Sequence, residues 1–306
     1  MKNKYKLGVI LALLTALISG FSNFIMKYAV TIVKDPIVFT TLKNSVVALL
    51  VIGLMLLFMK WREIKDLRLH DWTKLILIGI IGGSIPFILF FTGLLESSAV
   101  NANFIHKTLF IWVAILSVPF LKEKLTFLQI AGMGLLVTGT LVIGGFSGFE
   151  FSRGELFIVL ATMLWAIENV IAKHVLKKFS ALLVTGGRMV LGSIVLLFVV
   201  WQQGNLYMFS NLSGQQWLWT TISAVFLSGY VLTWYAALKR APATVVTTLL
   251  VPSALITNIL IAVIDAHNIN TNLIYGTLLT LAGVGIYLYF SKSLSKSKAK
   301  QLKLKV

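Results

Sequence analysis

The sequence predicts an all-α polytopic membrane protein whose ten transmembrane helices form two inverted five-helix repeats. Hydrophobic residues make up 58% of the chain and charged residues only 12%, about half the charged fraction of a typical soluble domain. Ten apolar stretches approach the ~20 residues that a helix needs to cross a ~30 Å hydrocarbon core. Small and polar residues also recur at a nearly constant offset, which indicates an internal duplication.

The ten expected spans follow one another with connections too short for a soluble domain. They cover about residues 7–26, 37–59, 75–95, 99–118, 126–146, 155–173, 181–201, 217–238, 243–264 and 272–290. We assign the first five to a repeat over residues 1–146, the next five to a repeat over residues 154–290, and residues 291–306 to a basic cytoplasmic tail. Because five is an odd number of crossings, the second repeat is expected to lie upside down relative to the first.

The net charge of +17 is distributed unevenly along the predicted topology. With the N-terminus inside, 21 of the 27 Lys and Arg residues fall on the inner side, 3 on the outer side and 3 within spans. This positive-inside bias places both termini in the cytoplasm and the chain in the cell (inner or cytoplasmic) membrane. The basic tail is then expected to lie against anionic lipid, so no nucleic-acid partner is predicted. The apolar run extends to about Met26, which favours an uncleaved anchor over a signal peptide.

Matching residues in the two halves support the duplication. A shift of 146 residues places Asn23 on Asn169, and a shift of 145 places Lys43 on Arg188. A shift of 144 aligns two pairs of glycines, Gly132 with Gly276 and Gly139 with Gly283. The offset drifts by only two residues along the chain, which chance matches between apolar helices would rarely produce.

Several short motifs resemble those of the drug/metabolite transporter superfamily, specifically its EamA-type members. The motifs are Leu164-Trp165-Ala166, the lone bases Lys43 and Arg188, Ser98-Ala99, Pro242-Ala243, and the turn Leu121-Lys122-Glu123-Lys124-Leu125-Thr126 followed by Gln129 and Gly132. The second half departs from the pattern at this turn, because His267 occupies the aligned Glu position, with Asp265 two residues earlier. The resemblance covers almost the whole chain and implies ten helices around a central cavity, alternating access and, usually, metabolite export.

Four charged residues lie well inside the predicted spans: Lys43, Lys107, Glu168 and Arg188. Such a residue costs on the order of 2.5–3.5 kcal/mol at the centre of a span, so it is expected to face a cavity or a partner. Glu168 and Arg188 fall at similar depth toward the inner side, either as a structural ion pair or as a gating or coupling site. Lys43 either contacts substrate or extends toward the outer surface.

Lys107 lies near the middle of the fourth span, with His106 beside it and Asn103 one turn earlier. No acid lies in this span, so Lys107 either binds an anionic substrate group or forms a salt bridge with Glu168 or Glu96. His106 is either a proton carrier near neutral pH or a packing residue.

Aromatic and amide side chains gather on spans six and eight. Trp165, Asn169, Trp234 and Tyr235 either line the substrate cavity or pack in the core. Pro86, Pro119 and Pro252 are expected to kink spans and to free backbone carbonyls. The chain has no cysteine, its histidines lack metal-ligand spacing, and we predict no metal site and no cofactor.

These features favour a secondary transporter of a small polar metabolite. No Walker motif is present, so transport would use a gradient, with protons or a counter-substrate as coupling partners. Three in-span bases against one acid favour an anionic or amino-acid-like substrate, and export is the favoured direction. One alternative is a transporter of organic or quaternary-ammonium cations with an acidic-aromatic site. A membrane-embedded enzyme is less favoured, because no clustered catalytic groups are recognisable.

Overall fold

The computed structural model describes residues 2–33, 35–146, 148–264 and 271–303. Within these ranges the regular structure is entirely helical. Ten helical stretches there are long and apolar enough to cross a membrane, which confirms the predicted all-α membrane fold. They are Asn3–Met26, Pro36–Leu57, Leu69–Leu95, Val100–Leu121, Phe127–Gly144, Arg153–Val175, Ala181–Gln202, Gly214–Arg240, Ala243–Ile264 and Thr271–Ser291. The second-half turn with Asp265 and His267 lies outside the described residues, as do the side chains of the tail beyond Ser291.

Six spans are single helices and four are interrupted. The single helices are α1 (Lys2–Val33), α2 (Pro36–Leu57), α7 (Phe127–Gly144), α8 (Arg153–Val175), α12 (Gly214–Arg240) and α15 (Thr271–Lys303). Span three consists of α3 (Leu69–Gly83) and α4 (Ile85–Leu95), and span four of α5 (Ala99–Lys107) and α6 (Leu109–Leu121). Span seven consists of α9 (Ala181–Gly186), the π-helical η2 (Gly187–Leu191) and α10 (Gly192–Gln202). Span nine consists of α13 (Ala243–Thr248) and α14 (Ser253–Ile264). The short helices η1 (Lys60–Asp66) and α11 (Tyr207–Ser210) lie in the two longest connections.

Polar residues at the span boundaries explain where several helices begin. Asp35 accepts hydrogen bonds from two backbone N–H groups of the first turn of α2. Thr126 with Gln129, and Ser213 with Gln216, form reciprocal capping boxes at the starts of α7 and α12. These side chains satisfy N–H groups that the first turn of a helix cannot pair internally.

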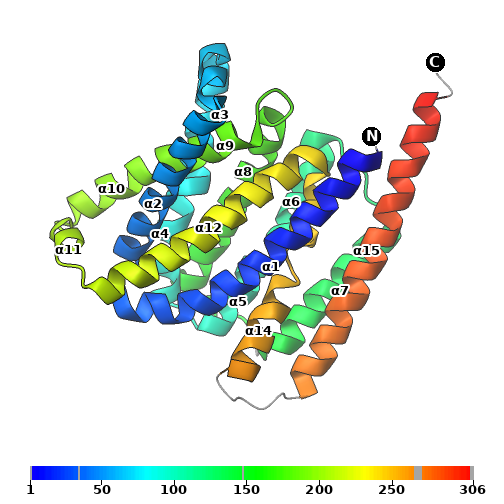
Figure 1. Ribbon diagram of the computed structural model, residues 1–306. Helices are drawn as coiled ribbons and strands as arrows, with labels where there is room; N and C mark the ends of the chain where they lie inside the picture. The colour runs from blue at the N-terminus through cyan, green and yellow to red at the C-terminus, as the bar shows by residue number, and fades with distance from the viewer. Residues whose placement is uncertain (1, 34, 147, 265–270, 304–306) are drawn as a thin grey trace.

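Helices of the two halves are interleaved rather than packed as separate bundles. Helix α1 runs along α12 and also contacts α14, while α8 packs against α3, α4 and α6 (Figure 1). Helices α7 and α15 pair at one side of the molecule (Figure 1). The polar groups described below therefore come from both halves of the chain.

The α7–α15 pair depends on the four glycines that match in the sequence. A Cβ on Gly132 would approach the carbonyl oxygen of Gly283 to 3.0 Å, and one on Gly139 would approach that of Gly276 to 2.9 Å. The helices are thus in backbone contact and run antiparallel, because the lower-numbered glycine of α7 meets the higher-numbered one of α15. Opposite directions of the fifth helices are compatible with two repeats of inverted topology.

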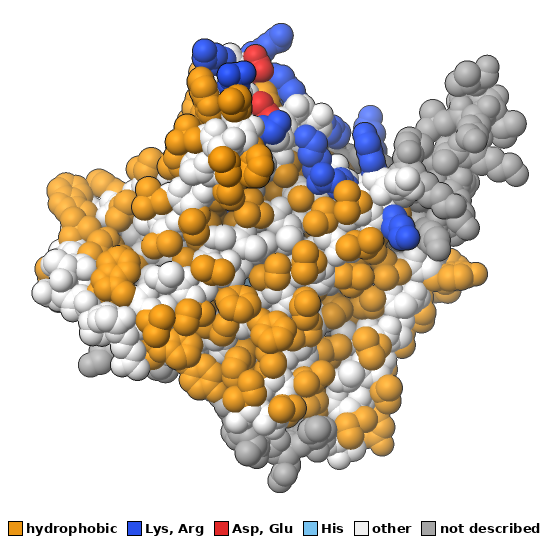
Figure 2. All heavy atoms as spheres, in the orientation of Figure 1, with side chains coloured by type: hydrophobic (Ala, Val, Ile, Leu, Met, Phe, Trp, Pro, Cys, Tyr) orange, Lys and Arg blue, Asp and Glu red, His pale blue; other side chains and the backbone are white. Residues whose placement is uncertain are grey.

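Charge is concentrated at one end of the molecule. Figure 2 shows Lys and Arg gathered at the end where Figure 1 places both termini, while hydrophobic side chains cover the flank. Exposed Lys and Arg residues also occur at positions 60–68, in the connection between spans two and three. This arrangement is what the positive-inside distribution predicts for a multi-pass membrane protein.

Candidate functional site

The break between α3 and α4 creates an unpaired backbone carbonyl in the core. In a continuous helix the Gly82 oxygen would accept from the N–H of residue 86, but Pro86 has none. Side chains of other helices replace that donor. Gly82 accepts from Trp165 Nε1 at 3.1 Å, and from Arg188 Nε and Nη2 at 3.2 and 3.0 Å. The break at Pro86 thus releases the Gly82 carbonyl, which accepts hydrogen bonds from Arg188 and fixes its position.

Arg188 projects from the π-helical turn η2 and is buried, with 7% of its surface exposed. A single π-turn within a helix is rare and frequently marks a functional site. The guanidinium also contacts Tyr235, at 3.4 Å from Nη1 to the hydroxyl and 5.9 Å to the ring centroid. Gly82 and Tyr235 therefore hold the guanidinium from two sides.

Glu168 and Arg188 are linked through Tyr235 rather than paired directly. The Tyr235 hydroxyl donates to Glu168 Oε1, and no contact within 4 Å joins the carboxylate to the guanidinium. The other carboxylate oxygen, Oε2, is buried without a hydrogen-bond partner among the described residues. The structural ion pair considered from the sequence is thus replaced by a three-residue relay.

The amide and aromatic residues of spans six and eight also form one network. Trp234 Nε1 donates to Asn169 Oδ1 at 3.1 Å, and Asn169 Nδ2 donates to the Trp165 carbonyl at 2.8 Å. Trp234 stacks on Tyr230 with centroids 5.8 Å apart. The indole N–H groups of Trp165 and Trp234 are therefore both hydrogen-bonded within the protein, which is typical of buried Trp.

Lys107 lies where two interrupted spans meet. It is the last residue of α5, and its Nζ donates to Ser253 Oγ, at the first residue of α14, at 3.2 Å. No salt bridge joins Lys107 to Glu168 or Glu96, so the bridge considered from the sequence is absent. The neighbouring His106 ring packs edge-on to Trp165 at 5.0 Å and to Phe90 at 5.3 Å.

The two other predicted site residues lie apart from this network. Lys43 is buried, with 3% of its surface exposed, so it does not extend to the outer surface. Among the described residues its Nζ contacts Met26 Sδ at 3.4 Å and lies 5.3 Å from the centroid of the Phe39 ring. Asn103 is exposed, and it forms no side-chain hydrogen bond with the other predicted site residues that the structure describes.

Sequence reasoning missed two further residues that link the halves, Ser253 and Glu155, and named Glu123 only as part of the turn motif, without its contacts. Ser253 was not singled out, although it directly follows Pro252, where α13 and α14 separate. Glu123 accepts from the backbone N–H groups of Ala243 and Thr244 at 2.7 and 3.1 Å, at the start of α13. Glu155 accepts from the Asn101 side chain near the start of α5. Acids directly before or within a span would have been the signal.

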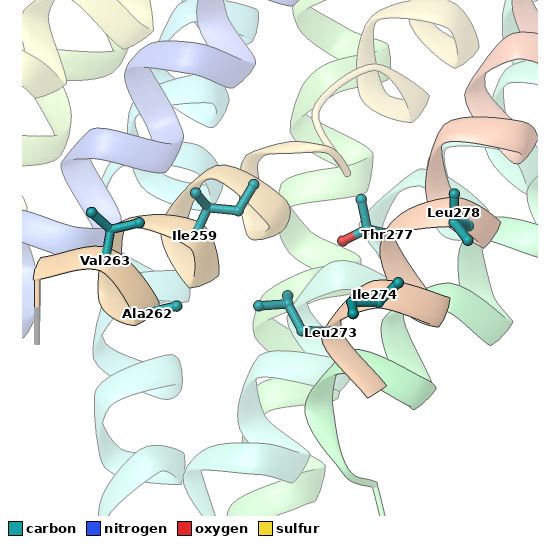
Figure 3. A pocket seen from close by; sticks show the side chains of 7 residues that line it. All are labelled: Ile259, Ala262, Val263, Leu273, Ile274, Thr277 and Leu278. Atoms are coloured by element: carbon teal, nitrogen blue, oxygen red, sulfur yellow. The ribbon is translucent and has the colours of Figure 1, made fainter. Parts of the chain in front are cut away.

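Two surface grooves lie away from these polar groups. One, of about 210 Å³, lies between α14 and α15. Figure 3 shows its lining of Ile259, Ala262, Val263, Leu273, Ile274, Thr277 and Leu278. The other lies between α2 and α12 and is lined by Val46, Leu49, Leu50, Gly53, Leu54 and Ser228. Neither contains a charged side chain, so the polar network is the better candidate for substrate contact.

Comparisons with known proteins agree with this architecture. A sequence model of the EamA-like transporter family matches residues 6–145 and again residues 152–289. An uncharacterized transporter of Archaeoglobus fulgidus is 28% identical over 191 residues, which cover 62% of this chain and 66% of the relative. One of Methanothermobacter thermautotrophicus is 24% identical over 140 residues, or 44% and 41% of the two chains. The matches thus span less than two thirds of these relatives.

A solved crystal structure has the same fold. It superposes with a TM-score of 0.76 at 16% identity and covers 94% of this chain and 98% of its own. At that identity the likeness concerns the arrangement of the helices alone.

Proposed function

Because the chain belongs to the EamA-like transporter family, whose model matches it twice, we propose that it is a secondary transporter of a small anionic or zwitterionic, amino-acid-like metabolite. The family and the relatives are transporters and not enzymes. The sequence carries no Walker motif, so the energy comes from a gradient or from exchange. The two family matches, with ten spans between them, support alternating access between two repeats.

The contact between Lys107 and Ser253 carries the proposal. It joins the interruption of span four in one half to the interruption of span nine in the other, at 3.2 Å. Discontinuous helices near the membrane midplane commonly form the substrate sites of secondary transporters. Lys107 has three N–H donors and one acceptor among the described residues, Ser253 Oγ, so it retains donors for a substrate carboxylate. The substrate carboxylate would either replace Ser253 Oγ as the acceptor of Lys107 or accept hydrogen bonds from both residues.

Charge around this contact favours an anion over a cation. Lys107 and Arg188 border the network, whereas Glu168 is its one acid among the described residues, and one of its oxygens accepts from Tyr235. The alternative of a quaternary-ammonium cage needs the Tyr235 ring, but the Arg188 guanidinium already lies 5.9 Å from its centroid. A second cation there would be repelled.

We propose export as the direction and the Glu168–Tyr235–Arg188 relay as the gating or coupling element. The dense positive charge at the end that holds both termini would concentrate anions at that mouth if it faces the cytoplasm (Figure 2). Glu168 Oε2 is buried and unpartnered, which suits a group that exchanges a proton or a hydrogen bond during the cycle.

Ligand-induced thermal stabilisation tests the proposal. The purified chain is screened against amino acids, organic anions, phosphorylated sugars and quaternary amines, because a ligand that binds the native state raises the melting temperature. Lys107→Met is compared with Lys124→Met, which removes the same charge from an exposed turn. We expect a carboxylate-bearing hit whose half-saturating concentration rises at least tenfold in Lys107→Met alone.

The same variants in proteoliposomes then test transport. Counterflow of the hit is expected in wild type and Lys124→Met and should fall at least tenfold in Lys107→Met. A hit confined to quaternary amines and lost in Glu168→Gln would overturn the anion proposal. Equal binding and counterflow in wild type and Lys107→Met would overturn the assignment of Lys107.

A further inference from the structure

Lys43 is a buried cation whose hydrogen-bonding capacity is almost unused. An ammonium group offers three donors, whereas its contacts among the described residues are a thioether sulfur at 3.4 Å and the Phe39 ring. Sulfur is a weak acceptor, and in the part of the chain that the structure describes no carboxylate lies within 4 Å of Lys43 Nζ. Buried charges are normally paired, so a cation without an oxygen partner among the described residues is suited to receive an external anion.

Two nearby hydroxyls are unpartnered as well. Buried Ser and Thr in helices commonly donate to the carbonyl four residues earlier, as Thr41 does to Ile37 at 2.8 Å. Thr40 Oγ1 and Ser223 Oγ are fully buried and have no hydrogen-bond partner within the described ranges. Both can therefore donate to something other than the backbone.

The helix packing places Ser223 at the depth of Lys43. Phe39 of α2 and Trp219 of α12 pack in one cluster with Met26, and Val46 of α2 lines a groove with Ser228 of α12. The two helices therefore run parallel, and Lys43 and Ser223 fall between the same two points of contact. One helical turn separates Phe39 from Lys43, and one separates Trp219 from Ser223.

We propose that Lys43, together with the hydroxyls of Thr40 and Ser223, binds one small monovalent anion, a halide or a carboxylate, between α2 and α12. One cation balances one negative charge, and the two hydroxyls supply further donors. Phe39, Met26 and Trp219 pack together on the side of the site toward the start of α2. This site is separate from the Lys107–Ser253 contact and does not depend on the transport proposal.

A bromide titration of the purified full chain tests the site. Thermal unfolding is followed as bromide replaces gluconate at constant ionic strength, and formate is titrated in a parallel arm. We expect a saturable rise in melting temperature in wild type, Lys107→Met and Lys124→Met. In Lys43→Met the half-saturating concentration should rise at least tenfold. A saturable shift with both bromide and formate identifies a site that binds halides and carboxylates. A saturable shift with bromide alone identifies a halide site.

A hydroxyl variant tests the site without removing the lysine. Thr40→Val combined with Ser223→Ala should raise the half-saturating bromide concentration at least threefold, even where Lys43→Met does not fold. The proposal is overturned if wild type shows no saturable shift with either ion, or if this double variant binds like wild type. A loss of bromide binding in Lys107→Met would also overturn it, since the ion would then occupy the proposed substrate site.

Discussion

Lys43 and Arg188 are matched by the internal repeat, yet their surroundings differ. Arg188 donates twice to the Gly82 carbonyl, whereas Lys43 meets a thioether and an aromatic ring. The difference originates in the spans that face them. Pro86 interrupts span three and releases the Gly82 carbonyl, but a shift of 144 or 145 residues places Pro86 on Tyr230 or Val231.

Helix α12 is consequently continuous from Gly214 to Arg240, and its carbonyls are used within the helix. It therefore has no released carbonyl to offer to Lys43. One proline thus decides whether a basic residue in a repeat-matched position is tied to the backbone or left with free donors. We infer that the arginine side is built for rigidity and the lysine side for exchange with a ligand.

Arg188→Met should have the largest effect on stability. It leaves the Gly82 carbonyl with the Trp165 donor alone and removes the cation beside the Tyr235–Glu168 pair. Breaking such buried contacts should cost about 3 kcal/mol. The measurement is thermal unfolding in detergent, with exposed Arg62→Met as the control. A change no larger than that of the control would contradict the anchoring role.

Gly82→Ala should come next. A Cβ at this position would overlap Glu168 Cγ, so the Glu168 side chain or the backbone must shift. Overpacking of this kind typically costs 1–3 kcal/mol, and we expect about 2 kcal/mol. Gly134→Ala on α7, where a Cβ meets nothing within 4 Å, is the matched control. Wild-type stability together with wild-type transport in Gly82→Ala would show that the position of Glu168 is not critical.

Trp165→Phe should have a smaller effect. It removes one of three donors to the Gly82 carbonyl but leaves both Arg188 bonds and most of the ring packing. We expect a loss of ~1 kcal/mol, the usual net value of one hydrogen bond. Trp201→Phe, at an exposed position, should change unfolding by less than about 0.5 kcal/mol. Equal effects of the two substitutions would mean that the hydrogen bond of the Trp165 indole N–H does not contribute to stability.

Local patterns predicted the spans and the kink at Pro86, because apolar length and a missing N–H are properties of the sequence itself. They did not predict that Arg188 binds Gly82, that Lys107 meets Ser253, or that span four breaks after Lys107. These contacts join residues more than 100 positions apart, so their geometry depends on how whole helices pack. The relay through Tyr235 was also missed, because its geometry too depends on how whole helices pack. Glu168, Arg188 and Tyr235 were nevertheless each singled out.

Lys43→Met should have the smallest effect on stability and is the sharpest test of the comparison with Arg188. Methionine fills similar space, and the substitution removes no hydrogen bond from an oxygen acceptor among the described residues. In halide-free gluconate buffer we expect the free energy of unfolding to change by less than about 0.5 kcal/mol. In saturating bromide the variant should fall below wild type, because only wild type gains from the bound ion. A loss in gluconate comparable to that of Arg188→Met would mean that Lys43 is anchored as firmly as its repeat partner.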